Sequence, residues 1–299
     1  MYRLSMTAVA LLLASASRAA VAEDGAPSLV GQKAPEIQTK EWLNSDGRTR
    51  IADYAGEVVL VESFATWCGP CRGQMPHLTE LTKKYGKKGL TVLSITQEPR
   101  ETVLKFMSQL NSAPVEYTMG IGGGNGGYKT QFIPHAWLIG PDGNVVWQGN
   151  PGGLSEKVLD AELKKVVKPT PEQIEERAGL GLKFANELAK SNRYVEALTV
   201  LDRVAEKYKG TTTATQATER KAALEGDQAV ASDLAAQKQI AKLVGAAEFH
   251  KDKVKDKQRE SVASKLEAAA KDNEGKNPGA VALAQMWLTV MTEDWKPEK

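Results

Sequence analysis

The only two cysteines of this 299-residue chain, Cys68 and Cys71, stand two residues apart. The run from Glu57 to Phe64 just before them is rich in Val and Leu, which predicts a buried strand. The stretch from Arg72 to Tyr85 has helical spacing, and Pro70 suits a first helical turn, where its missing N–H is not needed. A C-x-x-C pair at a strand-to-helix junction is typical of a redox site or of half a metal site.

The remaining sequence argues against a metal. A structural zinc site needs two further Cys or His ligands, yet there is no other cysteine, and His77, His135 and His250 form no ligand-spaced pair. A purely structural disulfide is a second alternative, but closing so small a loop gains little stability. We therefore expect Cys68 and Cys71 to form a redox-active disulfide, with no metal and no other cofactor.

The position of each cysteine predicts its role. Cys68 would begin a helix, where free backbone N–H groups and the helix dipole favour a thiolate, so we expect it to be the attacking residue. Cys71, one turn further on, should be more buried and should resolve the mixed disulfide. Glu62 lies in the apolar strand, where burial would raise its pKa and allow it to exchange a proton with Cys71. The alternative is that Glu62 faces solvent on an edge strand.

Periodicity predicts an α/β region up to about residue 168. The expected strands are Ile37–Trp42, Arg48–Ile51, Val58–Phe64, Thr91–Thr96, Val115–Met119, His135–Ile139 and Val145–Gln148. The expected helices are Gly69–Tyr85, one that opens at Pro99, and Leu154–Val167. The glycine-rich stretch Gly122–Gly127 formally fits G-x-G-x-x-G, but too few residues follow it for the helix that a dinucleotide site needs, so we read it as a flexible loop without a nucleotide.

Composition changes at Lys168-Pro169-Thr170-Pro171, where prolines and a threonine cap predict a helix start. We therefore expect three parts: a signal peptide at 1–22, an α/β domain at 23–168 and an all-α domain at 169–299. In the last, residues 192–211 are similar to one tetratricopeptide hairpin, and such units usually stack. A protein partner or self-association would then involve 169–299, and a solvated appendage is the alternative.

The first residues read as an export signal. Arg3 is followed by an apolar core from Met6 to Ala14 and a small-x-small site at Ala20-Val21-Ala22. The apolar core is too short to span a bilayer, although retention as an anchor stays open. Removing 1–22 takes away two arginines and no acid, which leaves 37 basic and 37 acidic residues, so nothing indicates nucleic-acid binding. We expect a periplasmic or otherwise extracytoplasmic protein, where disulfides persist.

The run from Val59 to Arg72 resembles the thioredoxin superfamily, and more closely the exported TlpA/ResA-type thiol–disulfide oxidoreductases. The resemblance covers about residues 28–167 and implies a thioredoxin-like fold, a central mixed sheet flanked by helices. Glu62 falls where thioredoxins have a buried aspartate, and Pro76 where a proline kinks the active-site helix. Ile133-Pro134 matches the cis-proline loop that shapes the peptide groove. Gln74 stands where many TlpA-like proteins have a glutamate, which would leave the acid–base role to Glu62.

We therefore expect an exported enzyme that exchanges disulfides with protein thiols and with an unidentified redox partner. Trp67, Gly69 and Pro70, with Ile133 and Pro134, would contact the substrate, and the Gly-Pro dipeptide matches that of thioredoxin, which favours a reductase. Two alternatives stay open. The helical part could recruit partners while the thioredoxin-like part only binds peptides, or Cys68 could reduce peroxide, although peroxidatic sites usually lack a C-x-x-C.

Overall fold

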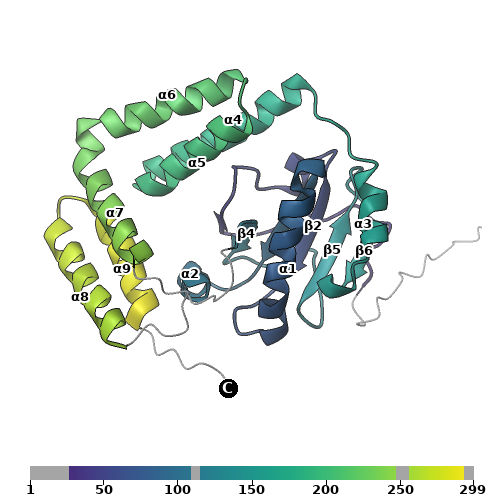
Figure 1. The fold of residues 1–299 in the computed structure, drawn as a ribbon, viewed down its shortest axis with the longest axis horizontal. Coiled ribbons are helices and arrows are strands. Elements are labelled where there is room, and N and C mark those ends of the chain that lie inside the picture. Colours follow the sequence, from purple (N-terminus) through teal and green to yellow (C-terminus); the bar gives the residue numbers. More distant parts are fainter. Residues whose placement is uncertain (1–26, 109–114, 247–255, 293–299) are drawn as a thin grey trace, which may run out of the picture.

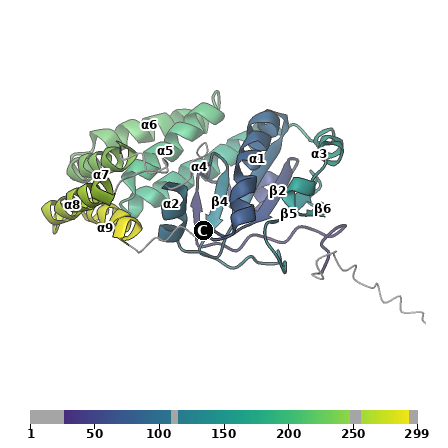
Figure 2. The ribbon, with the colours of Figure 1, turned by 60° about the horizontal axis from the view of Figure 1, so that its bottom comes forward.

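A computed structural model describes residues 27–108, 115–246 and 256–292 of the chain. Figures 1 and 2 show an α/β part that carries a sheet and a helical part that curves along one side of it. The signal-peptide prediction for 1–22 falls outside the described residues. In the three described ranges, no helix is both long enough and apolar enough to cross a membrane.

A six-stranded mixed sheet forms the centre of the α/β part, in the order β1-β4-β3-β2-β5-β6. β2 lies between β3, to which it is parallel, and β5, to which it is antiparallel. All six residues of β2 are buried, as its continuous apolar sequence predicts. The strands are β1 (Glu41–Leu43), β2 (Val58–Ser63), β3 (Leu90–Ile95), β4 (Thr118–Ile121), β5 (His135–Ile139) and β6 (Val145–Gly149).

The two faces of the sheet are covered differently. One face packs against α1 (Gly69–Tyr85), α2 (Arg100–Ser108) and α3 (Glu156–Leu163), and its residues form one core cluster with side chains from these helices. The other face is covered by the segment around residues 29–37, the 3-10 helix Ile51–Tyr54 and Tyr128. This arrangement confirms the predicted thioredoxin-like fold class.

Several predicted boundaries are wrong. The expected strand Arg48–Ile51 is absent, because Arg48 turns into an ion-pair network and a 3-10 helix begins at Ile51. The strand predicted at Ile37–Trp42 is reduced to the three residues of β1, and β4 begins three residues after Val115. α3 is shorter than the predicted Leu154–Val167, since it starts at a serine cap, Ser155, and ends at Leu163.

In the described residues after 170, six helices follow the α/β part. Thr170 caps the first of them through the N–H of Gln173, and Pro171 occupies its first turn, as the sequence predicts. α4 packs on α5, α5 on α6, and α8 on α9, while α7 contacts both α8 and α9. The helices are α4 (Pro171–Lys190), α5 (Tyr194–Lys207), α6 (Thr212–Gly226), α7 (Gln228–Ala246), α8 (Asp256–Asn273) and α9 (Pro278–Thr292).

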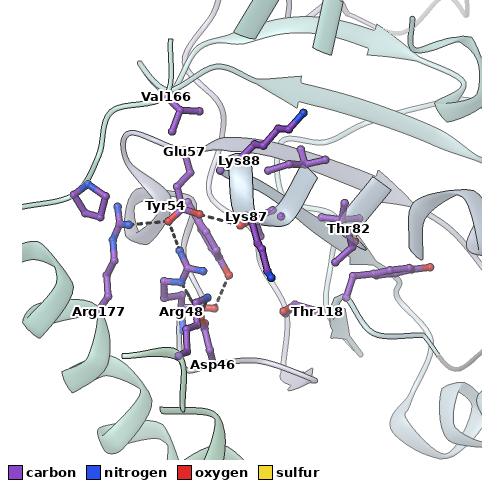
Figure 3. A pocket seen from close by; sticks show the side chains of 18 of the residues that line it. Asp46, Arg48, Tyr54, Glu57, Thr82, Lys87, Lys88, Thr118, Val166 and Arg177 are labelled. Atoms are coloured by element: carbon purple, nitrogen blue, oxygen red, sulfur yellow. Dashed lines mark hydrogen bonds and ion pairs between the residues drawn. The ribbon is translucent and has the colours of Figure 1, made fainter. Parts of the chain in front are cut away.

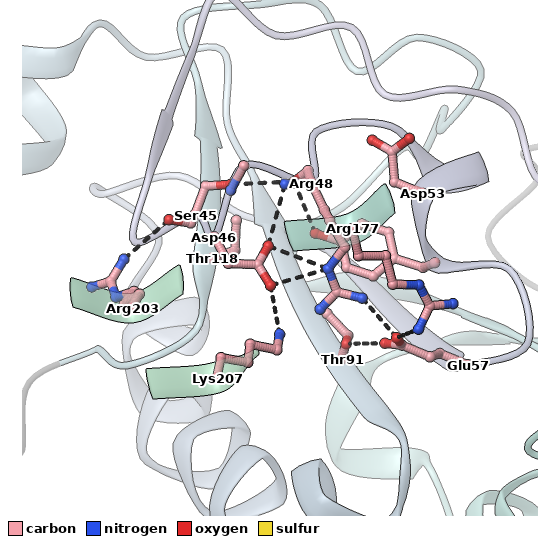
Figure 4. A network of polar contacts seen from close by, with 12 residues as sticks. Ser45, Asp46, Arg48, Asp53, Glu57, Thr91, Thr118, Arg177, Arg203 and Lys207 are labelled. Carbon is pink, nitrogen blue, oxygen red and sulfur yellow. Dashed lines mark hydrogen bonds and ion pairs between the residues drawn. The ribbon is translucent and has the colours of Figure 1, made fainter. Parts of the chain in front are cut away.

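An ionic network joins α4 and α5 to the α/β part (Figure 4). Its centre is the Arg48 guanidinium, which is 4% exposed and lies 3.0 Å from Asp46 and 2.7 Å from Glu57. Arg177 of α4 also pairs with Glu57, at 2.7 Å, and Lys207 of α5 pairs with Asp46, at 2.5 Å. Burial alone would raise the pKa of Asp46, but the charges of Arg48 and Lys207 hold it below its ordinary value.

Two glycines allow the backbones to meet beside this network. A Cβ on Gly47, whose φ is +95°, would lie 2.4 Å from the Cα of Gly181 in α4. A Cβ on Gly181 would lie 2.6 Å from the carbonyl oxygen of Asp46. The helical part is thus closely docked on the α/β part, and the division into independent domains at residue 168 stays a prediction.

A cleft of about 960 Å³ lies at this junction (Figure 3). Its walls come from the loop around Arg48, the end of α1, the start of β3 and helices α4 and α5, and they include Lys87, Lys88 and Arg177. The cleft lies at the edge of the sheet where β3 begins and α1 ends. The end of β2 and the start of α1 lie at the opposite edge.

Candidate active site

The cysteine pair lies where β2 gives way to α1. Cys68 is the N-cap of α1, and its Sγ accepts a hydrogen bond from the N–H of Cys71 at 3.2 Å. The two residues form a disulfide with Cα atoms 5.3 Å apart. Cys68 is 4% exposed and Cys71 is fully buried. Pro70 takes the first turn of the helix, so the local sequence accounts for this geometry.

The segment before β5 forms a second wall of the site. Ile133–Pro134 is a cis peptide bond, as the family resemblance implied, and the Ile133 carbonyl oxygen lies 3.7 Å from Cys68 Sγ. Two aromatic side chains are exposed here, Trp67 to 67% and Phe132 to 48%. The structure therefore places an apolar surface next to the disulfide. Phe132 was not among the predicted site residues, although its place two residues before Pro134 could have indicated it.

Glu62 is fully buried in the centre of the sheet. Side chains alternate along a strand, so Glu62 shares the face of Val58 and Leu60, which pack in the same cluster as Cys71. Its Oε2 accepts a hydrogen bond of 2.6 Å from Ser94. Burial raises the pKa of Glu62 to about 7, although the Ser94 hydroxyl favours the charged form. The alternative of a solvent-facing edge position is wrong.

A tyrosine and a serine complete the surroundings of this carboxyl. Burial and then the charge of Glu62 raise the pKa of Tyr117, and the Ser94 hydroxyl acts in the opposite direction. Among the described residues, Glu62 Oε1 has no hydrogen-bond partner. A carboxyl that has a pKa near 7 and one oxygen without a hydrogen-bond partner can both accept and release a proton at pH 7.

Glu98 is a site residue that the sequence reasoning missed. Its carboxylate accepts hydrogen bonds from the Thr66 N–H and the Thr66 hydroxyl, each at 2.7 Å. Thr66 lies in the turn closed by the Cys68 N–H on the Ala65 carbonyl at 3.1 Å. Glu98 therefore fixes the turn that leads into Cys68. The sequence indicates that these two residues lie near each other, because Thr66 and Glu98 follow two neighbouring parallel strands and such strands end at one edge of the sheet.

The remaining candidates lie as follows. Pro76 is inside α1, and Gln74 is on the next turn after Cys71, close to Gly152. His135 starts β5 and is 1% exposed, between the rings of Phe132 and Trp137, so it is part of the protein interior. The glycine-rich stretch packs against residues 35–40, where a Cβ on Gly123 would lie 2.2 Å from a carbonyl oxygen. Close packing therefore accounts for a glycine at that position.

Comparisons with known proteins agree with this site. Residues 30–148 match the AhpC/TSA family. The thiol-disulfide oxidoreductase ResA of Bacillus anthracis is 28% identical over 140 residues, which cover 46% of this chain and 78% of that protein. ResA of Geobacillus thermodenitrificans is 37% identical over 79 residues, 26% of this chain and 44% of the relative. A thiol-disulfide isomerase from Corynebacterium glutamicum is a structural neighbour with 18% identity and a TM-score of 0.36, covering 45% of this chain and 96% of its own.

The N-terminal half of the chain is therefore a thioredoxin-like thiol–disulfide oxidoreductase domain, with its disulfide at the start of α1. It is similar to ResA proteins over most of their length, and a helical part follows the residues that match the AhpC/TSA family.

Proposed function

We propose that this protein is an exported oxidoreductase that exchanges disulfides with protein substrates, mainly as a reductase, through Cys68 and Cys71. The observation that carries the proposal is the disulfide at the N-terminus of α1, beside the Ile133 carbonyl and the exposed ring of Trp67. An exposed ring and a backbone carbonyl next to the sulfur suit an extended peptide that carries the substrate cysteine.

In the reducing direction, the Cys68 thiolate attacks one sulfur of a substrate disulfide, and the bond between the two substrate sulfurs breaks. One substrate sulfur is then joined to Cys68, and the other leaves as a thiolate that takes a proton from water. Cys71 loses its proton and attacks the Cys68 sulfur, which releases the second substrate thiol. The substrate gains two electrons, and Cys68 and Cys71 become a disulfide that a partner dithiol must reduce again.

Glu62 is the proposed proton acceptor for Cys71. Its Oε1 has no hydrogen-bond partner among the described residues, and its side chain lies on the face of the sheet that packs in the same hydrophobic cluster as Cys71. Both features support this role. With a pKa of about 7, Glu62 is partly deprotonated at neutral pH and can take the proton when Cys71 attacks. The side chain of Gln74 is an amide, which does not titrate, so the role of proton acceptor is assigned to Glu62 alone.

Export is the second part of the proposal. It is supported by the sequence pattern of residues 3–22 and by the absence of any cysteine other than the pair, since an oxidising compartment suits a protein that handles the thiols of others. Cell fractionation and N-terminal sequencing test this. We expect the mature chain in the extracytoplasmic fraction, beginning near Glu23, whereas an uncleaved chain in the cytoplasm would contradict it.

An insulin-disulfide reduction assay tests the reaction. We expect the wild-type chain to reduce insulin with dithiothreitol as electron donor, and Cys68→Ser to lose this activity. Cys71→Ser, reduced beforehand and mixed with insulin in the absence of dithiothreitol, should instead accumulate a mixed disulfide through Cys68, visible as a mass increase that later addition of dithiothreitol removes. Full activity in Cys68→Ser would rule out the proposed mechanism.

A further inference from the structure

The helical part contacts the segment that holds the active-site turn. Glu98, whose carboxylate accepts hydrogen bonds from Thr66, is followed after one proline by Arg100, the first residue of α2. Glu98 is also fixed in its own place: its carboxylate accepts from the Thr96 hydroxyl at 3.1 Å, and its carbonyl accepts from the Gly122 N–H at 2.9 Å. The sheet side of the molecule therefore holds Glu98, and two residues further on the same segment continues into α2, which packs against α9 of the helical part.

Arg100 is held by a cluster of four charged residues that spans both parts of the chain, which we call the Arg100 cluster: Glu41, Arg100, Arg193 and Glu196. The Arg100 guanidinium lies 3.0 Å from Glu41 of β1 and 2.8 Å from Glu196 of α5. Arg193 completes the cluster, at 2.6 Å from Glu196 and 3.2 Å from Glu41. The Arg100 side chain is only 12% exposed, so solvent weakens these ion pairs less than it weakens pairs on the surface.

A third contact comes from the last helix. The Nε–H of Arg100 points at the sulfur of Met286 in α9, at 3.4 Å, and α2 packs along α9 (Figures 1 and 2). One side chain thus joins β1, α5 and α9, two residues away from the carboxylate that fixes the turn before Cys68. Since β2 and β3 are parallel, this junction lies at the same edge of the sheet as the disulfide.

We propose that Arg100 is a positioning residue through which the helical part holds Glu98, and with it the Ala65–Cys68 turn, in the geometry that stabilises the Cys68 thiolate. This rests on the proposed function, in which Cys68 is the nucleophile. The helical part is then a component of the redox site.

The direction of the effect follows from the N-cap. The Cys68 sulfur is favoured as a thiolate by the N–H of Cys71 and the start of α1, and this requires the turn before it to stay in place. Loss of the Arg100 contacts loosens the turn, raises the pKa of Cys68 and destabilises the reduced form. The reduction potential of the pair then becomes more negative, because a stabilised thiolate is what makes such a pair oxidising.

The experiment measures the pH dependence of Cys68 alkylation by iodoacetamide, and the reduction potential, in Arg100→Gln. We expect the pKa of Cys68 to rise by about half a unit, which slows alkylation at neutral pH about threefold. The matched control is Arg177→Gln, which removes an ion pair between the same two parts at the opposite edge of the sheet. It should leave both readouts unchanged. Equal shifts in the two variants, or none in Arg100→Gln, would overturn the proposal.

A double-mutant cycle separates positioning from the charge of Arg100 itself. If Arg100 acts through Glu98, adding Arg100→Gln to Glu98→Ala changes neither the alkylation profile nor the potential any further. A shift of the same size in both backgrounds would mean that the guanidinium acts through space, which contradicts the proposal. Thiol titration needs no substrate, so these results are read independently of whether insulin is reduced.

Discussion

At the scale of single residues, Glu62 sets the pH behaviour of the protein. It is fully buried, and its pKa of about 7 lies well above the ordinary glutamate value. The native state therefore retains a proton that the unfolded chain releases at lower pH. At acidic pH Glu62 is protonated in both states and does not change the free energy of unfolding. As the pH rises from the unfolded-state pKa towards the native pKa, burial of Glu62 lowers the free energy of unfolding progressively.

We expect Glu62→Gln to stabilise the oxidised protein at alkaline pH. The stability of the wild type relative to the variant should fall between about pH 4.5 and pH 7 and stay constant above that. The full difference is on the order of 3 kcal/mol, because burial raises the pKa of Glu62 from its ordinary 4.5 to about 7. Urea unfolding of both proteins at pH 4.5 and pH 8 measures it. A difference in stability that is the same at both pH values would contradict the assignment.

The same substitution should affect turnover in the opposite sense. Glu62→Gln removes the proton acceptor of Cys71, so the rate of insulin reduction should fall most near pH 7. The loss should shrink at high pH, where water and hydroxide deprotonate Cys71. A pH–rate profile that is unchanged by the substitution would remove Glu62 from the mechanism.

At the scale of elements, the sequence predicted those parts of the fold that are set by local pattern. The continuous apolar run of β2, the capped start of α4 and the helix after Cys68 were all expected from spacing and caps. The strand predicted at Arg48–Ile51 is wrong because an alternation of polar and apolar residues is the same whether the polar side chain faces solvent or enters a buried ion pair. The role of Glu98 was missed because Thr66 lies 32 residues away, and the two residues are brought together only by the parallel pairing of β2 with β3, which indicates the shared end of the strands but not the hydrogen bond.

The same limit applies to Gly181, which no local pattern marks as a contact between the two parts. We expect Gly181→Ala to destabilise the chain by about 1–3 kcal/mol, since the added methyl would meet the Asp46 carbonyl and Val204. Gly179→Ala, on the same helix with open space around its Cβ, is the control and should be neutral or stabilising by up to about 1 kcal/mol. Chemical denaturation compares them. Equal effects would mean that the close approach of α4 is unimportant.

At the scale of the whole molecule, two ionic clusters hold the helical part on the α/β part at opposite edges of the sheet. The Arg48 network lies beside the start of β2, and the Arg100 cluster lies at the edge of the sheet where the disulfide is. Neither could be predicted from the sequence, because each ion pair between the two parts joins residues far apart in the chain. This close docking argues against the alternative of a solvated helical appendage, while a tetratricopeptide-type repeat stays a prediction.

Arg48 tests the docking. We expect Arg48→Met to cost about 3–5 kcal/mol, the range for breaking a buried ion pair, because Asp46 and Glu57 lose a shared partner. The neighbouring Arg50 is 64% exposed and pairs with Asp53, whose buried carboxylate also accepts hydrogen bonds from the N–H groups of Thr49 and Arg50. Arg50→Met should therefore leave the urea midpoint nearly unchanged. Similar midpoints for the two variants would show that the network does not stabilise the junction.

The proposed activity requires that the Cys68–Cys71 pair cycles between disulfide and dithiol. Equilibration of the full chain in thiol redox buffers, followed by alkylation and mass measurement, gives its reduction potential. We predict one two-electron transition between about −120 and −270 mV, the span of catalytic C-x-x-C proteins. A pair that stays oxidised below about −300 mV, where structural disulfides lie, would contradict a catalytic role.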